Sequence, residues 1–201
     1  MSKAEDENKI KVILLGESGV GKTNIINIVV GKPFNENEGS TIASSFVEKK
    51  IKVDGADYLL NLWDTIGQEQ FRQLTKLFYS DSNIVIFVYD ITNKKSFEEL
   101  NYWLKDVENH LGNDFIKVII GNKKDLFLKE EVKEEEGEEF AKNIGAKFLY
   151  FSAKNDNAKI LEDFLIDSIK DYIVTYDKKN IGKIKIIEDR DFNNQGSSCC
   201  P

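Results

Sequence analysis

The sequence predicts an α/β fold with a six-stranded, mostly parallel sheet that has one antiparallel strand and about five helices. Three observations support this prediction. Short apolar runs alternate with helix-like stretches, a glycine-rich turn joins the first run to the first helix-like stretch, and 41% of the 201 residues are hydrophobic, enough for one sizeable core. The runs at residues 46–53 and 58–63 are joined through Asp54 and Gly55, which predicts a hairpin and supplies the antiparallel strand.

Composition along the chain predicts one folded domain at residues 10–176. Residues 1–9 are polar and are expected to form a flexible N-terminus. Residues 177–201 have little apolar periodicity and contain Asn, Gly and Ser near the end, so we expect a flexible C-terminal tail. No internal repeat is visible in the sequence.

The first motif is GESGVGKT at residues 16–23, which follows the apolar run 12–15 and opens the helix-like run 24–30. Its glycines allow positive φ angles, so several backbone N–H groups can turn toward one polyanion at the helix N-terminus. Lys22 can then reach the β- and γ-phosphates of a nucleotide, and the Thr23 hydroxyl can bind Mg²⁺. The predicted phosphate-binding residues are Gly16, Glu17, Ser18, Gly19, Val20, Gly21, Lys22 and Thr23.

Two later motifs predict that the base is guanine. NKKD at residues 122–125 and SAK at residues 152–154 each follow an apolar run, so both belong where strands of an open sheet end. The Asp125 carboxylate can accept the N1–H and 2-amino hydrogens of guanine, which adenine does not offer. A backbone N–H near Ala153 can donate to guanine O6. The predicted base-binding residues are Asn122, Lys123, Asp125, Ser152, Ala153 and Lys154.

The segment WDTIGQE at residues 63–69 completes the predicted active site. Asp64 can hold Mg²⁺ through a water molecule. The backbone N–H of Gly67 can bind a γ-phosphate, which makes this loop a sensor of the third phosphate. Gln68 can orient the attacking water, so Gln68 and Lys22 are the predicted catalytic residues.

With these motifs, residues 10–175 resemble the Ras superfamily of small GTPases. VYDIT at residues 88–92, Ser96-Phe97, GQEQFRQLT at residues 67–75 and the closing cysteine pair are similar to signatures of the Rab family. The resemblance implies that Phe34 packs beside the guanine and that Thr41 closes over Mg²⁺. It also implies that the aromatic triad Phe46, Trp63 and Phe78 faces effectors.

The resemblance implies the small GTPase version of the P-loop NTPase fold and a GDP/GTP switch in intracellular vesicle traffic. Mg²⁺ is the implied cofactor, with GTP as substrate and GDP as product. The implied partners are effectors of the GTP state, an exchange factor, a GTPase-activating protein, a GDP-dissociation inhibitor and a prenylation escort protein. Neither Arg72 nor Arg190, the only arginines, lies in the first switch, so we expect slow unaided hydrolysis, on the order of 10⁻⁴ to 10⁻³ per second.

Three departures from the Rab pattern affect the interpretation. Ala43 and Ser45 stand where Rabs usually carry a glycine and an acidic residue, and FYSDS at residues 78–82 replaces a Tyr-Tyr-Arg-Gly loop. Both regions are expected to face partners, which favours a divergent effector set. Ile66 replaces a small alanine, and its stiff β-branched side chain needs room beside the γ-phosphate. A GTP-binding module with impaired hydrolysis, run by exchange and partner capture, is therefore the alternative function.

Charge and composition argue against other classes of protein. The net charge of −7, with no dominant basic cluster, argues against nucleic-acid binding. The acidic run at residues 130–139 is interpreted as the solvated face of a helix, with Val132, Phe140 and Ile144 supplying buried contacts. Trp103 is expected in the core. A nucleotide kinase is disfavoured because an arginine-rich lid is missing.

The sequence ends in Ser197-Ser198-Cys199-Cys200-Pro201, which holds the only cysteines. Farnesylation needs a cysteine fourth from the end, where Ser198 stands. The ending instead resembles the doubly geranylgeranylated tails of Rabs, and two lipids make a stable anchor where one binds only marginally. With no signal peptide or long apolar span, the expected location is the cytoplasm and the cytosolic face of an intracellular membrane, through lipidation of Cys199 and Cys200.

Overall fold

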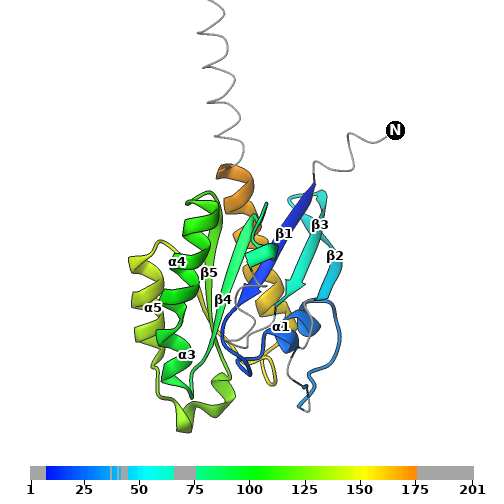
Figure 1. Ribbon diagram of the computed structural model, residues 1–201. Coiled ribbons are helices and arrows are strands. Elements are labelled where there is room, and N and C mark those ends of the chain that lie inside the picture. The colour runs from blue at the N-terminus through cyan, green and yellow to red at the C-terminus, as the bar shows by residue number, and fades with distance from the viewer. Residues whose placement is uncertain (1–7, 37, 40, 42–44, 66–75, 176–201) are drawn as a thin grey trace, which may run out of the picture.

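The computed structural model describes residues 8–36, 38, 39, 41, 45–65 and 76–175. Predictions for Ile66, Gly67, Gln68, Ala43 and the cysteine pair lie outside these residues. The described strands form one six-stranded sheet in the order β2-β3-β1-β4-β5-β6, in which only β2 and β3 pair antiparallel (Figure 1). The strands are β1 (Lys9–Leu15), β2 (Ser45–Val53), β3 (Ala56–Asp64), β4 (Ile84–Asp90), β5 (Ile116–Asn122) and β6 (Lys147–Tyr150).

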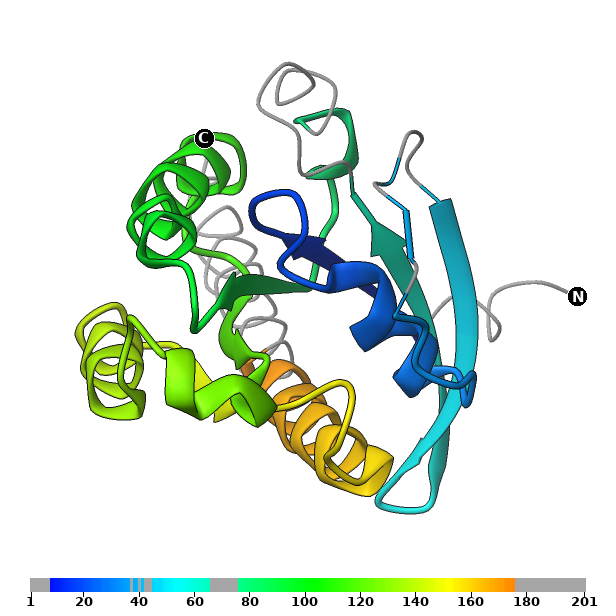
Figure 2. The same ribbon diagram turned by 90° about the horizontal axis from the view of Figure 1, so that it is seen from below.

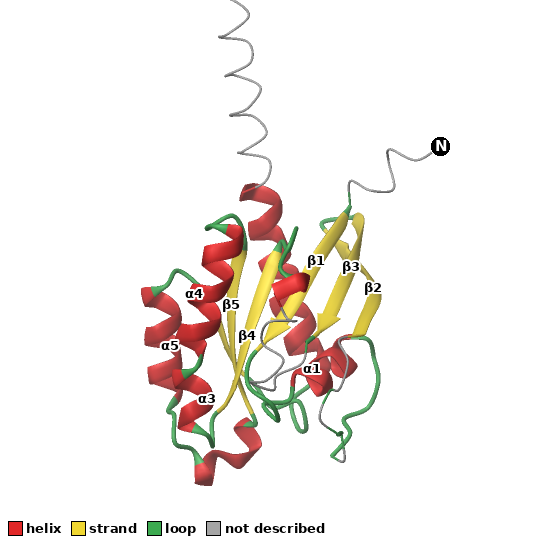
Figure 3. Cartoon of the chain, viewed as in Figure 1, coloured by secondary structure: helices red, strands yellow, loops and turns green. Residues whose placement is uncertain are grey.

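Five α-helices lie in the described part of the chain, in agreement with the sequence-based prediction. They are α1 (Lys22–Val29), α3 (Lys94–Glu98), α4 (Leu100–Leu111), α5 (Glu134–Asn143) and a helix at residues 158–175. Two short 3₁₀ helices, η2 (Lys76–Phe78) and η3 (Lys124–Lys129), join other elements (Figure 3). Helix α1 and the helix at 158–175 cover one face of the sheet, and α3, α4 and α5 cover the other (Figure 2).

Successive side chains of β1 point to opposite faces of the sheet and so belong to two separate layers of the core. Ile10, Val12 and Leu14 pack with α1 and the helix at 158–175, whereas Ile13 and Leu15 pack with the opposite helices. All seven residues of β4 are buried, as expected for a strand covered on both faces. The hydrophobic effect on both sides of the sheet therefore fixes its position between the helices.

The predicted packing of the amphipathic helices is confirmed. Trp103 is fully buried on α4, and Val132 is fully buried just before α5. The glutamates of the acidic run are exposed, and three of them occupy the first turn of α5, where the helix dipole favours negative charge. Phe140 and Ile144 are partly buried against the core.

The sheet topology brings the predicted motifs together. The chain places β2 and β3 on one side of β1 and then β4, β5 and β6 on the other side, so the strand order reverses at β1. Ligands of open α/β sheets bind beyond the carboxyl ends of the strands at such a point. The loops after β1, β5 and β6, which carry the three motifs, all leave from this edge, at the bottom of Figure 1. No helix among the described residues is long and apolar enough to span a bilayer.

Candidate nucleotide-binding site

The loop between β1 and α1 has the backbone that a phosphate cradle needs. Gly16, Gly19 and Gly21 all have positive φ, as predicted. A Cβ on Gly16 would lie 2.1 Å from the Val88 carbonyl oxygen, and one on Gly21 would lie 2.3 Å from Asn122 Nδ2. The N-terminus of α1 has no side-chain cap and no acidic residue in its first turn, so its N–H groups and dipole are available to an anion.

Lys22 is buried at the start of α1 with its amine folded back over the loop. Its Nζ donates to the carbonyl oxygens of Gly16 and Glu17, each at 2.9 Å. Burial lowers the pKa of Lys22 to about 8, against the opposing effect of the Asp64 and Glu17 carboxylates. An anionic phosphate beside this amine would favour its charged form.

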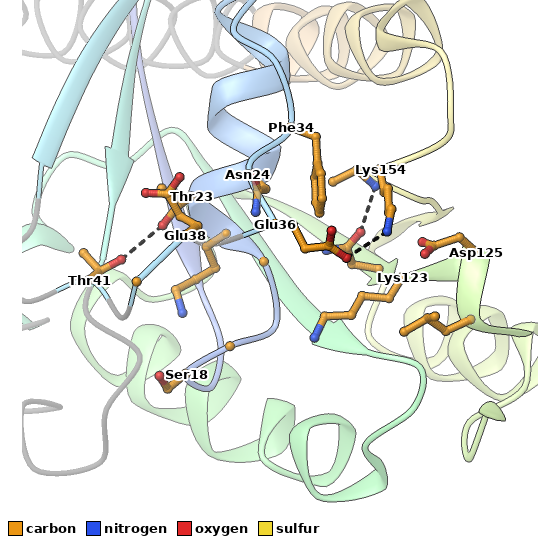
Figure 4. A pocket seen from close by; sticks show the side chains of 17 residues that line it. Ser18, Thr23, Asn24, Phe34, Glu36, Glu38, Thr41, Lys123, Asp125 and Lys154 are labelled. Carbon is orange, nitrogen blue, oxygen red and sulfur yellow. Dashed lines mark hydrogen bonds and ion pairs between the residues drawn. The ribbon is translucent and has the colours of Figure 1, made fainter.

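Oxygen atoms from three elements meet beside the cradle. Thr23 Oγ1 lies 3.1 Å from Thr41 Oγ1 (Figure 4). Thr23 Oγ1 also donates to Asp64 Oδ2 at 2.8 Å. Asp64 Oδ1 is buried without a hydrogen-bond partner among the described residues, and burial raises the pKa of this carboxyl. Hard oxygen ligands around one carboxylate fit Mg²⁺, which commonly takes its other ligands from phosphates and water.

Asn122 joins the motifs at the other end of the site. Its Nδ2 donates to the Val20 carbonyl oxygen at 2.8 Å, and its Oδ1 accepts the backbone N–H of Ala153 at 3.1 Å. That a backbone N–H near Ala153 donates to guanine O6 stays a prediction, and in this structure the N–H of Ala153 itself is bonded to Asn122. Asp125 Oδ1 accepts a hydrogen bond from Ser152 Oγ, so these two predicted residues are adjacent.

The three motifs line one cavity of about 310 Å³, large enough for a small-molecule ligand (Figure 4). The structure brings together twelve predicted residues around it. They are Ser18, Gly19, Gly21, Lys22, Thr23, Phe34, Thr41, Asn122, Lys123, Asp125, Ala153 and Lys154. The other described residues predicted for the site do not line the cavity; they are Gly16, Glu17, Val20, Asp64 and Ser152.

The structure adds residues to the lining that the sequence motifs missed. Asn24, Glu36 and Glu38 also face the cavity. Asn24 is 8% exposed, and a buried amide needs hydrogen-bond partners. This burial next to Thr23 identifies Asn24 as a residue of the site, and it is visible only in the structure. Lys123 lines the cavity but its Nζ pairs with Asp90 Oδ2 at 2.7 Å, an ion pair that the sequence did not predict.

The aromatic triad forms a continuous surface on β2, β3 and η2. The ring of Trp63 lies 5.3 Å from that of Phe46 and 5.2 Å from that of Phe78, between centroids. Phe46 is 47% exposed. Residues 78–82 are expected as a region to face partners, and within this region Tyr79 and Ser82 are buried. Tyr79 is buried because it packs in the core layer beside α4.

The fold and this cavity define a P-loop nucleotide-binding protein. A model described as the Ras family matches residues 11–171. The chain is 36% identical to mouse Ras-related protein Rab-21, covering 94% of this chain and 90% of the mouse protein. It is 40% identical to human Rab-21, covering 82% of this chain and 72% of the human protein. It is 42% identical to Rab-8A of Pongo abelii, covering 72% of this chain and 70% of that protein. The chain belongs to the Rab family of the Ras superfamily of small GTPases, which bind and hydrolyse GTP.

Proposed function

We propose that this small GTPase acts in vesicle traffic as a GDP/GTP switch and recruits effectors when GTP is bound. One observation carries the proposal: Asp125 lines one end of the cavity and Thr23 and Thr41 line the other, with the phosphate cradle between them (Figure 4). Asp64 accepts the hydrogen bond of Thr23 beside that second end. This arrangement suits a guanine at one end and a γ-phosphate at the other. Thr41 and Gly67 then hold two segments in the GTP state and release them after hydrolysis.

Positioning and charge stabilisation account for the proposed chemistry. The cradle N–H groups and the Lys22 amine balance the charge that develops on the phosphoryl oxygens, and Gln68 positions the attacking water. Thr23, Thr41 and Asp64 would hold Mg²⁺, which supplies further charge neutralisation at the β- and γ-phosphates. No arginine of this chain lies in the first switch, so an activating protein supplies one in trans.

The base-selecting role of Asp125 is tested by Asp125→Asn. The variant replaces one acceptor oxygen with a donor, which suits xanthine better than guanine. We expect competition binding with labelled GDP to show at least a tenfold shift from GTP toward xanthosine triphosphate. Asp163→Asn, on the exposed surface of the C-terminal helix, serves as the control. Unchanged guanine selectivity in Asp125→Asn would exclude this base site.

The alternative is a GTP-binding module with impaired hydrolysis, and the Ile66 side chain favours it. Its test is single-turnover hydrolysis by the native chain and by Ile66→Ala. If the isoleucine obstructs the reaction, the alanine variant hydrolyses GTP several times faster while its GTP affinity stays within twofold. Equal rates in the two proteins would remove the steric argument.

We also propose the partners and the location that follow from a Rab switch. Effectors contact the triad of Phe46, Trp63 and Phe78, and an exchange factor and an activating protein set the nucleotide state. A prenylation escort protein and a GDP-dissociation inhibitor handle the lipids carried by Cys199 and Cys200. The domain at residues 10–176 then works on the cytosolic face of an intracellular membrane. A pull-down from lysate that compares the GDP form with a GTP-analogue form identifies the effectors.

A further inference from the structure

Asn24 makes a paired contact with the chain segment at residues 34–36, which borders the cavity. Its Nδ2 donates to the Asn35 carbonyl oxygen at 3.0 Å, and its Oδ1 accepts the Asn35 backbone N–H at 2.9 Å. One carboxamide thus binds both backbone polar groups of a single residue, as a neighbouring strand would. A methyl side chain can form neither bond. A hydroxyl has its donor and its acceptor on one oxygen, so it does not span the two backbone groups as the separate nitrogen and oxygen of the carboxamide do.

The segment held by this pair carries the aromatic residue of the cavity. Phe34 directly precedes Asn35 and lines the cavity beside Lys154, at the end where Asp125 lies (Figure 4). The ammonium of Lys154 lies 5.9 Å from the centre of the Phe34 ring. Fixing the backbone at Asn35 therefore fixes where the Phe34 ring stands at the base end of the site.

A second contact joins the same segment to the loop after β6. Lys154 Nζ pairs with Glu36 Oε1 at 3.0 Å, but the Lys154 and Glu36 side chains are 44% and 76% exposed. An exposed ion pair contributes little to holding a segment, whereas hydrogen bonds of a buried amide contribute more and leave unpaired groups when lost. The Asn24 pair is therefore the stronger of the two attachments.

We propose that Asn24 is a positioning residue that holds Phe34 against the bound base and thereby slows nucleotide release. The inference depends on the proposed guanine site, with Phe34 as its aromatic wall. Asn24 acts through the backbone of Asn35 rather than by touching the base. Removing the paired amide lets the segment move away and opens the base end of the cavity.

The test is the release rate of a fluorescent GDP analogue from the purified full-length chain after addition of excess GDP. We expect Asn24→Ala and Asn24→Ser to speed release about tenfold, which corresponds to roughly 1.4 kcal/mol. Alanine is the better helix former, so Asn24→Ala does not weaken α1 itself. Glu36→Gln, which removes only the exposed ion pair, should speed release less than Asn24→Ala does. Asn27→Ala, on the same helix at a residue that does not line the cavity, is the matched control and should change release less than twofold.

A double-mutant cycle with Phe34→Ala separates positioning from general weakening of the fold. If Asn24 acts through Phe34, Asn24→Ala changes release less than twofold once Phe34 is already alanine. An equal tenfold effect in both backgrounds would overturn the positioning role, as would an unchanged rate in Asn24→Ala alone. A native chain that fails to retain the labelled GDP at all would instead reject the proposed nucleotide site.

Discussion

At the scale of single residues, Asn122 connects parts of the chain that are far apart in sequence. Its side chain is 2% exposed and bridges the Val20 carbonyl of the cradle to the Ala153 N–H of the third motif. Gly21 is required next to it, because a Cβ there would lie 2.3 Å from the Asn122 amide. The base end and the phosphate end of the cavity are therefore held in a fixed relation by one amide.

This arrangement predicts that Asn122→Asp destabilises the fold although the two side chains have the same shape. The carboxylate keeps the bond to Ala153 but faces the Val20 carbonyl with no hydrogen to donate, in a buried place. We expect the free energy of unfolding to fall by at least about 2 kcal/mol, measured by urea denaturation at one fixed, saturating GDP concentration.

The matched control for this substitution is Asn113→Asp. Asn113 is exposed, and its Oδ1 accepts a hydrogen bond from Lys117, so a carboxylate there keeps a favourable contact. Its unfolding midpoint should stay close to that of the native chain. A native-like midpoint for Asn122→Asp as well would show that the bridge contributes nothing to stability.

At the scale of elements, α5 packs closely on the sheet because it carries Gly137. A Cβ at this position would lie 2.4 Å from the Tyr89 hydroxyl oxygen and 2.7 Å from the Phe148 ring. Tyr89 is buried on β4, and burial raises the pKa of its hydroxyl. A glycine in a helix interior normally weakens the helix, so its presence here reflects the close contact between α5 and the sheet.

Gly137→Ala therefore tests two opposing effects. The alanine gains about 1 kcal/mol in helix propensity, but overpacking against Tyr89 and Phe148 costs about 1–3 kcal/mol. We expect a net loss of about 1 kcal/mol in the free energy of unfolding, measured by urea denaturation. Glu138→Ala, at the neighbouring exposed position, should be nearly neutral. A variant more stable than the native chain would mean that α5 shifts easily to make room.

At the scale of the whole molecule, the cavity and the end of the described chain lie at opposite ends of the sheet. The loops that form the cavity extend beyond the carboxyl ends of the parallel strands, whereas the C-terminal helix ends at Thr175 at the other end (Figure 1). A lipid anchor attached through residues 177–201 would therefore join the domain on the side away from the nucleotide. Such an anchor would leave the nucleotide loops accessible while the protein is at a membrane.

The proposed anchor predicts the behaviour of cysteine variants in cells. Changing both Cys199 and Cys200 to serine removes both lipids, and we expect the protein to move from the membrane fraction to the soluble fraction. Single variants should distribute between the fractions, because one lipid binds only marginally. The measurement is cell fractionation with immunodetection. Membrane association that persists in the double variant would rule out lipidation as the anchor.

Much of the fold and the nucleotide site is predictable because their signals are local. Apolar runs of the right length define β4 and β5, and the glycines with Lys22 and Thr23 define the cradle within eight residues. Contacts between distant residues are not predictable in this way. The orientation of the Ala153 N–H and the burial of Tyr79 both depend on groups that only folding brings near.

By itself, the sequence determined which chemical groups are present and at which strand ends they stand, since periodicity and motif spacing are properties of the chain. It thereby specified the α/β fold, the family resemblance and the candidate nucleotide residues. Tertiary structure alone decided which of those groups touch. The Asn24 pair with Asn35 spans 11 residues and the Asn122 bond to Val20 spans 102. Hydrogen bonds act over about 3 Å, so such partners are set by how the elements pack in space.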